Sequence, residues 1–75
     1  MIEVRLFATF REGRQKIFLL EESQFQFQTV IKVLEHLQIP KEEVAICLIN
    51  GRHSKLETTL NQGDVLALFP PVGGG

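Results

Sequence analysis

The sequence contains little that would tie it to the cell exterior or to a membrane. It has a single cysteine, Cys47, which excludes an internal disulfide and with it the framework of a small secreted protein. No apolar run approaches the roughly 18 residues that a membrane-spanning helix needs. The start at Met1 carries no signal-peptide pattern. We therefore expect a cytoplasmic protein with no membrane partner.

An excess of charge of one sign is also missing. The 8 lysine and arginine residues are balanced by 9 acidic residues, so the formal net charge is -1. Binding to a nucleic-acid duplex needs several clustered cations, whereas the basic residues here are scattered along the chain among acids. We expect no nucleic-acid partner.

Groups for independent catalysis are equally scarce. The 75 residues allow one domain, and a domain of this size hides only about 60% of its unfolded surface, which leaves little room for a deep catalytic cavity. His36 and His53 have no cysteine or acid at ligand spacing, so no metal site is expected. In an enzyme reaction we expect the chain to act as a subunit, a substrate or a carrier rather than as a complete catalyst.

Alternating and continuous apolar runs predict the strands. Every second residue from 2 to 10 is apolar, which predicts a strand with one apolar face. A polar turn around Gly13 then leads to a second strand at residues 16–20. The apolar run at residues 44–49 suits a central strand, and residues 65–69 form the last strand.

The segment between these strands predicts one helix and two turns. Thr29 is a suitable N-cap, apolar residues follow helical spacing from Val30 to Leu37, and Pro40 ends a helix of about ten residues. Asn50-Gly51 predicts a type I′ hairpin turn, because both residues of that turn need positive φ. Residues 62–64 predict another turn, after an irregular connection.

The resulting order is strand, strand, helix, strand, short strand, strand. It predicts an α+β domain with a mixed sheet of four to five strands and one helix that covers only one sheet face. The predicted core consists of Leu6, Ile17, Leu19, Val30, Val33, Leu34, Leu37, Cys47, Ile49 and Val65.

The end of the chain predicts an arm. Residues 1–69 make up the domain and residues 70–75 a flexible tail, in which Pro70 and Pro71 stiffen the base and three glycines leave the end slim. A carboxylate at Gly75 on such an arm can enter an active site too narrow for any Cβ. The alternative is a frayed terminus or a cloning remnant.

Phe7 has two interpretations. It lies on the opposite face of the first strand from Leu6, so it is exposed and available to a partner if the single helix covers the Leu6 side. Alternatively, Phe25 and Phe27 or a curled sheet cover it.

Several motifs together resemble the ubiquitin-like sulfur carriers of the MoaD/ThiS family. The similarity spans the whole chain, and the motif Gly-Asp-x-x-x-x-Phe-Pro-Pro-Val followed by a terminal Gly-Gly is specific. The motifs are Val4-Arg5-Leu6-Phe7-Ala8-Thr9-Phe10-Arg11-Glu12, Leu48-Ile49-Asn50-Gly51, Leu60-Asn61-Gln62-Gly63-Asp64-Val65 and Phe69-Pro70-Pro71-Val72-Gly73-Gly74-Gly75.

The resemblance implies a β-grasp fold and a reaction at the tail. A partner activating enzyme would adenylate the Gly75 carboxylate with ATP, and a sulfur donor system would convert it into a thiocarboxylate, with Gly74 beside it in the narrowest part of the active site. No cofactor would be bound to the chain itself. The opening motif and Phe-Pro-Pro-Val are most similar to the small subunit of molybdopterin synthase, whose partner is the large subunit of that enzyme.

By the same resemblance, hydrophobic residues and the base of the tail would contact the activating enzyme and the large subunit. These partner-binding residues are Phe7, Leu60, Phe69, Pro70, Pro71, Val72 and Gly73. Three alternatives stay open: a carrier for the thiamine thiazole, a protein modifier conjugated to lysines, and a pure interaction domain.

Overall fold

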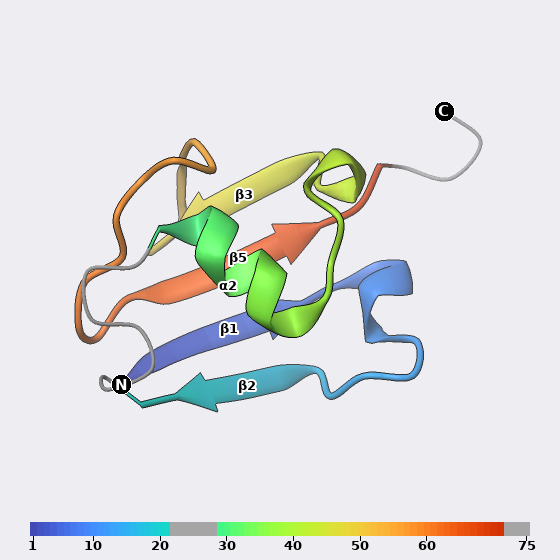
Figure 1. Ribbon diagram of the computed structural model, residues 1–75, viewed down its shortest axis with the longest axis horizontal. Coiled ribbons are helices and arrows are strands. Elements are labelled where there is room, and N and C mark those ends of the chain that lie inside the picture. Colours follow the sequence, from blue (N-terminus) through green and yellow to red (C-terminus); the bar gives the residue numbers. More distant parts are fainter. Residues whose placement is uncertain (22–28, 72–75) are drawn as a thin grey trace.

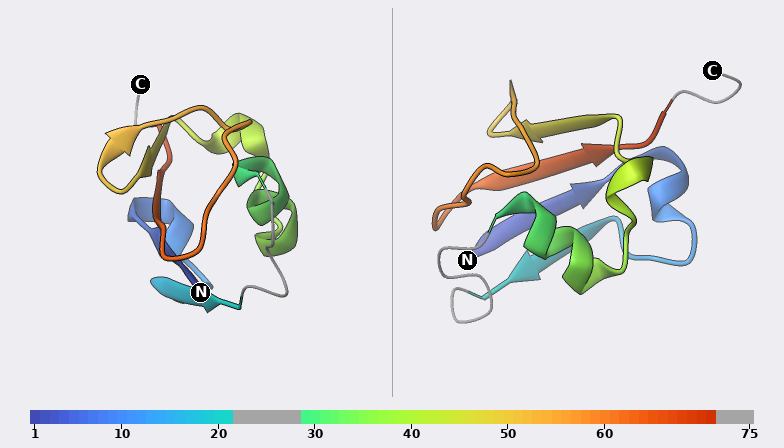
Figure 2. Two further views of the ribbon diagram at one scale, coloured as in Figure 1. Left: turned by 90° about the vertical axis from the view of Figure 1, so that its left-hand side faces the viewer. Right: turned by 45° about the horizontal axis from the view of Figure 1, so that its top comes forward.

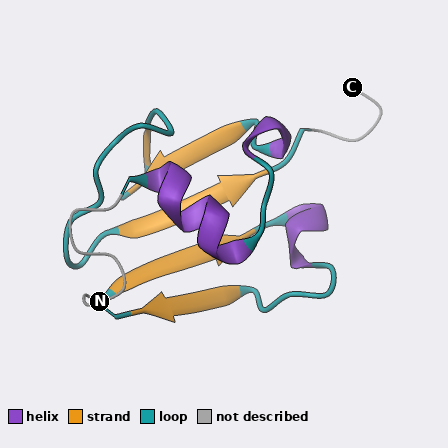
Figure 3. Cartoon of the chain, in the orientation of Figure 1, coloured by secondary structure: helices purple, strands orange, loops and turns teal. Residues whose placement is uncertain are grey.

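The computed structural model describes residues 1–21 and 29–71, in which one sheet is packed against one α-helix (Figures 1 and 3). In chain order the elements are β1 (Ile2–Leu6), η1 (Ala8–Arg11), β2 (Ile17–Leu20), α2 (Val30–Leu37), η2 (Lys41–Glu43), β3 (Ile46–Ile49), β4 (Arg52–His53) and β5 (Val65–Phe69). The two η elements are short 3₁₀ helices. This order of strands and helix confirms the α+β prediction.

The five strands form a mixed sheet in the order β2-β1-β5-β3-β4. β1 and β5 pair in parallel, whereas all other neighbours are antiparallel. Helix α2 lies across one face of the sheet, as both views in Figure 2 show. Because β1 and β5 run in the same direction, they end at the same edge of the sheet, and the chain leaves the domain at that edge.

The first strand is shorter than its alternating pattern predicts. β1 ends at Leu6, and Ala8 then takes the left-handed conformation with a φ of 54° where η1 begins. This conformation costs an alanine roughly 1–2 kcal/mol, and η1 places Phe10 in the core. The strand expected at residues 44–49 is also shorter, since it begins at Ile46 after η2.

Helix α2 begins where the sequence predicts. The Thr29 hydroxyl oxygen accepts a hydrogen bond from the Lys32 amide at 3.4 Å, as expected of an N-cap. The first two helical amides donate to the carbonyl oxygens of Thr58 and Leu56, at 3.1 and 3.0 Å. The loop after β4 thus satisfies donors that a helix start leaves without an intrahelical partner. The helix ends at Leu37, and its C-cap residue Gln38 is left-handed with a φ of 60°.

The core lies between α2 and the sheet. Its buried apolar residues are Ile2, Val4, Leu6, Phe10, Leu20, Val30, Val33, Leu34, Ile39, Cys47, Leu60, Leu66 and Leu68. Partly buried Leu37 and Ile49 pack against this cluster. The structure therefore confirms seven of the predicted core residues, namely Leu6, Val30, Val33, Leu34, Leu37, Cys47 and Ile49.

The other three predicted core residues lie on the opposite face of the sheet. Ile17 and Leu19 are 50% and 60% exposed, and Val65 is half-buried. In the β1–β2 register Ile17 pairs with Arg5 and Leu19 with Glu3, so these side chains point away from α2. All four residues of β2 are apolar, so alternation alone did not distinguish its two faces.

We call the face of the sheet that points away from α2 the open face. The ion pair between Glu3 and Arg5 lies on it. Its apolar residues are exposed or half-buried: Phe7, Ile17, Leu19, Ile46, Leu48, Val65, Ala67 and Phe69. Within the described residues α2 covers only the other face of the sheet, so this apolar surface is exposed or half-buried there. Phe25 and Phe27, the alternative cover predicted for Phe7, lie outside the described residues.

Candidate functional site

The candidate site lies where β5 ends and the chain leaves the domain. Pro70 is half-buried and Pro71 exposed. Neither proline has an amide hydrogen, so the β5 ladder ends here. Residues 72–75, which are the predicted site residues Val72, Gly73, Gly74 and Gly75, lie outside the described residues. The structure therefore describes the base of the predicted tail.

Two aromatic rings stack at this base. The ring centroids of Phe7 and Phe69 are 4.4 Å apart, and the ring planes are 9° apart. The two residues meet because each directly follows a residue of the parallel pair Leu6 and Leu68. Both rings are half-buried on the open face, so each offers apolar surface beside the exit of the chain. Their predicted contact with a partner stays a prediction.

Arg11 lies over the stack. Its Cζ is 5.2 Å from the centroid of the Phe7 ring, a cation–π distance, and its Nε donates to the Leu6 carbonyl oxygen at 2.9 Å. The position of Arg11 over Phe7 could not be predicted from the sequence, because the strand predicted at residues 2–10 left no place for the 3₁₀ turn that brings Arg11 back over Phe7.

Leu60 does not belong to this surface. Its side chain is 2% exposed and is part of the core cluster, so its prediction as a partner-facing residue is wrong. The physical reason is the loop after β4, which folds back onto the start of α2, where Thr59 forms a bridge with Thr29. That path turns Leu60 inward.

A pocket of about 230 Å³ opens next to Phe7. It is lined by Arg5, Leu6, Phe7, Arg11, Lys16 and Ile17. These residues lie in or next to β1, η1 and β2, and the Leu6 amide donates a hydrogen bond to the Lys16 carbonyl oxygen at 2.8 Å. Three cations that are scattered in the sequence thus converge in space, at one side of the aromatic stack. We call this the basic pocket.

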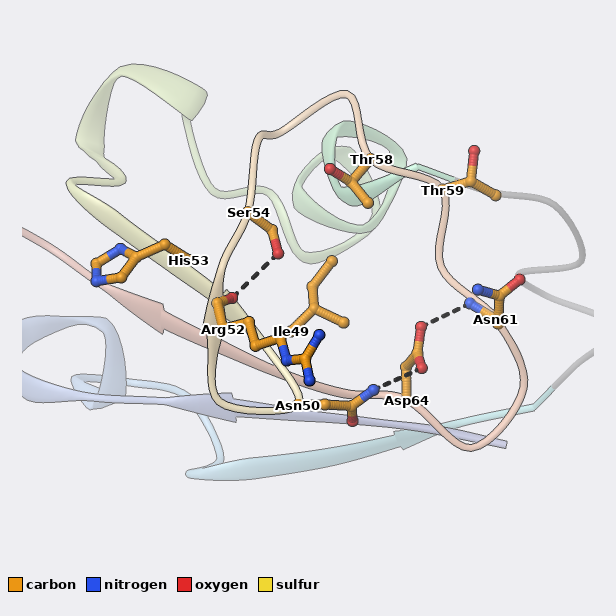
Figure 4. Close-up of a pocket in the computed structure, with 9 residues that line it drawn as sticks. All are labelled: Ile49, Asn50, Arg52, His53, Ser54, Thr58, Thr59, Asn61 and Asp64. Carbon is orange, nitrogen blue, oxygen red and sulfur yellow. Dashed lines mark hydrogen bonds between the residues drawn. The ribbon is translucent and has the colours of Figure 1, made fainter.

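A larger depression of about 500 Å³ lies at the other end of β5, between the β3–β4 hairpin and the following loop (Figure 4). Asn50 Nδ2 donates to Asp64 Oδ1 at 2.9 Å, and the Asn61 amide donates to Asp64 Oδ2 at 2.8 Å. Asn50 Oδ1 accepts from the Val65 amide at 2.9 Å. These bonds hold two turns together, and the His53 ring points away from the depression in Figure 4. We assign it a structural role.

The other groups that could carry chemistry are Cys47 and any metal ligands. Cys47 is buried, and burial raises the pKa of its thiol above the ordinary value of 9.0. A buried neutral thiol is a poor nucleophile and metal ligand, which confirms that Cys47 packs as a small hydrophobic residue. Residues 1–21 and 29–71 contain no group of three or more His, Cys, Asp or Glu side chains placed to hold a metal ion.

None of the helices in these ranges has the length and apolar character needed to cross a membrane.

A mixed five-stranded sheet packed on one helix is the ubiquitin-like β-grasp arrangement. A model of the ThiS family matches residues 4–75. The chain therefore belongs to this family of ubiquitin-like sulfur carriers, which includes the MoaD proteins.

Similar proteins come from archaea and bacteria. The chain is 28% identical to small archaeal modifier protein 3 of Haloferax volcanii, over 99% of this chain and 98% of that protein. The crystal structure of SAMP1 from Haloferax volcanii matches with a TM-score of 0.72 and 28% identity, over 99% of this chain and 98% of that one.

A third similar structure is a complex of subunits 1 and 2 of the molybdopterin-converting factor from Helicobacter pylori. A chain in it matches with a TM-score of 0.60 and 26% identity, over 99% of this chain and 97% of that one. A protein similar to this chain thus assembles there with a partner subunit.

Proposed function

We propose that this chain is a sulfur carrier for molybdopterin biosynthesis. A partner activating enzyme adenylates the Gly75 carboxylate with ATP, and a sulfur donor system converts the adenylate into a thiocarboxylate. The large subunit of molybdopterin synthase then receives the carrier, and the thiocarboxylate sulfur enters the dithiolene of the molybdenum or tungsten cofactor.

One observation carries this proposal: a central strand, β5, leads directly into a proline-stiffened base that continues to three glycines. Glycine has no Cβ, so an arm of glycines fits a narrow active site. The stack of Phe7 on Phe69 offers apolar contact to an enzyme that must hold the domain while it works on the arm. The family match to residue 75 and the likeness to the Helicobacter pylori complex further support the proposal.

The chemistry requires a better leaving group than a carboxylate provides. A Gly75 carboxylate oxygen attacks the α-phosphorus of ATP, which forms the acyl-adenylate and releases pyrophosphate. With hydrosulfide as the sulfur nucleophile, attack on the acyl carbon forms a C–S bond and breaks the C–O bond to AMP, which leaves with the electron pair. The thioacid loses its proton, and the thiocarboxylate is then a nucleophile at the end of the arm.

The experiment is a mass measurement. The chain is incubated with ATP, a sulfide source and the purified activating enzyme, and its intact mass should rise by the difference between one sulfur and one oxygen. Deleting Gly75 should abolish this rise, and Gly74→Ala should slow it, because a methyl group then enters the narrowest part of the active site. Full conversion of the Gly75-deleted chain would contradict the proposed mechanism.

The aromatic stack provides a second test. Replacing Phe69 with serine should raise KM for the carrier in the activation reaction by about tenfold or more, because apolar contact with the enzyme is lost. Phe18→Ser is the matched control, since Phe18 is also half-buried but packs against the core. It should lower the free energy of unfolding and leave KM unchanged while the domain is folded. The reverse pattern would assign Phe69 to the core.

A second candidate function is protein modification, which the 28% identity to a small archaeal modifier protein favours. In that case a lysine amine of a target displaces AMP, and an isopeptide bond forms at Gly75. Trypsin leaves no short remnant of the native chain on a target, because Lys55 is the last basic residue. Expressing Val72→Arg in cells solves this problem: three glycines on target lysines would support modification, and their absence would favour the carrier.

The third possibility, a carrier for the thiamine thiazole, uses the same activation and is consistent with membership of the ThiS family. The sulfur acceptor distinguishes it. Loss of sulfur from the thiocarboxylate when the large synthase subunit and its pterin substrate are added would support the molybdopterin function. Loss only in the presence of a thiazole-forming enzyme would contradict it.

A further inference from the structure

The basic pocket is a second point of contact that the tail chemistry does not use. We propose that it binds an acidic side chain, an aspartate or a glutamate, of the enzyme that activates Gly75, and so fixes the domain on that enzyme. This rests on the proposed function and names the partner group that the open face recognises.

The charge of the pocket points to an anion. Arg5, Arg11 and Lys16 line it, and none of its lining residues is acidic. Glu3 pairs with Arg5, but in the described parts of the chain neither Arg11 nor Lys16 forms an ion pair. Within the described residues two positive charges therefore lack an acidic partner, although the formal net charge of the whole chain is -1. A local positive potential favours a carboxylate at this place and steers its approach.

The Arg11 guanidinium and the main chain at Lys16 are held in place before any partner arrives. Arg11 is fixed by its hydrogen bond to the Leu6 carbonyl oxygen and by its position over the Phe7 ring. Lys16 is anchored through its main chain, since the Leu6 amide donates to its carbonyl oxygen at 2.8 Å. A guanidinium that is already oriented loses less conformational freedom when it binds a carboxylate.

The apolar part of the pocket favours a protein over a free anion. Ile17 is 50% exposed and lines the pocket together with Phe7. A free phosphate would gain nothing from these side chains, whereas a protein segment can place a carboxylate on the cations and an apolar neighbour on Ile17. Phe7 belongs both to this pocket and to the aromatic stack, so the pocket continues the surface already assigned to the activating enzyme.

The test compares two charge reversals of equal size. Lys16→Glu changes the pocket, and Lys55→Glu makes the same change at an exposed position in the loop after β4. In the ATP-dependent activation reaction, Lys16→Glu should raise KM for the carrier by about tenfold or more with kcat unchanged, because like charges then meet in the contact. Lys55→Glu should leave KM within about twofold. The ratio of the two KM values should fall as salt is added.

Equal KM values for the two variants would overturn the proposal. If Lys16→Glu does not fold, Lys16→Ala and Arg11→Ala replace it, with a smaller expected rise in KM. The effect of Lys16→Glu on binding should persist in a chain that lacks residues 72–75. If it disappears there, the pocket binds the chain's own terminus, and the proposal is overturned. A wild-type chain that is not converted at all would contradict the proposed function and this proposal together, whereas normal conversion with no KM change contradicts the pocket alone.

Discussion

Leu34 on α2 is 1% exposed, whereas Leu19 on β2 is 60% exposed. Replacing Leu34 with alanine should lower the free energy of unfolding by about 2–5 kcal/mol, because the change removes buried surface and leaves a cavity. Leu19→Ala makes the same chemical change on the open face and should cost no more than about 0.5 kcal/mol. Urea denaturation of both variants measures the difference. Equal losses would show that the faces of β2 or α2 are misassigned.

The buried Cys47 thiol predicts a pH dependence. Burial raises its pKa above the ordinary value of 9.0, so at alkaline pH the unfolded chain releases the thiol proton before the folded chain does. The folded state then holds more protons, and stability falls as pH rises from about 9 towards the folded pKa. Below this window the contribution is constant.

Cys47→Ala removes this titration and should flatten the alkaline fall in unfolding free energy. Measuring both chains by urea denaturation between about pH 7 and pH 10 isolates the effect, because all other titrating groups are shared. A difference between the two chains that stays constant over this range would contradict the prediction.

Some residue roles could be predicted because they depend on local chemistry. The N-cap at Thr29 and the turn at Asn50-Gly51, with φ values of 53° and 82°, follow from side-chain and backbone preferences of single residues. The inward position of Leu60 could not, because it depends on a loop that packs on a helix from another part of the sequence. Burial is a tertiary property.

At the scale of elements, the two turns at one end of the sheet are linked by side chains. Asn50→Ala removes the bonds to Asp64 and to the Val65 amide, and it places alanine at a positive φ, so we expect a loss of about 1–3 kcal/mol of unfolding free energy. Asn61→Ala is the control, because only the main chain of Asn61 bonds to Asp64.

The Asn61→Ala change should cost less than about 0.5 kcal/mol. Asn50→Gly separates the loss of the hydrogen bonds from the backbone strain at residue 50, since glycine tolerates the positive φ but lacks the amide side chain. Chemical denaturation of the three variants gives the comparison. If Asn50→Gly is as stable as the wild type, the link between the turns contributes nothing.

The order of the elements could be predicted, and their faces and ends only in part. Apolar patterning located β1, β2, α2, β3 and β5, because the apolar spacing changes from two to 3.6 where strand gives way to helix. The short strand β4 was implied only by the Asn50-Gly51 turn. The patterning failed on β2, where both faces are apolar and only the pairing of Ile17 with Arg5 decides which one is buried. It also extended β1 too far, because Phe10 fits either an alternating strand or the 3₁₀ turn that actually buries it.

For the whole molecule, we expect the residues up to the end of β5 to determine stability and the residues after it to be needed only for function. Deleting residues 72–75 should change the free energy of unfolding by no more than about 0.5 kcal/mol, because the buried cluster of the described chain ends at Leu68. The same deletion should abolish thiocarboxylate formation. Deleting residues 69–75 also removes Phe69 and its pairing with Ile46, and it should destabilise the domain. Thermal unfolding of the two truncated chains is the measurement, and equal melting temperatures would contradict this division.

The tail and the basic pocket, the two parts of the candidate site, differ in how far they can be predicted from the sequence. The tail is contiguous, so its prolines and glycines can be recognised without a structure. The basic pocket draws on three separate segments, and its cations are brought together by the β1–β2 pairing and by η1. A count of charges along the chain therefore missed it.

The parallel pairing of β1 and β5 also determines how the domain responds to force. A pull on Pro71 acts along the axis of β5, which has a ladder on both sides, to β1 and to β3. Hydrogen bonds that lie across the strand direction are then loaded in shear and must break together. A pull across an edge strand such as β4 would instead open its bonds one after another, like a zipper. Tension applied to the arm is therefore borne by a strand that is hydrogen-bonded on both sides.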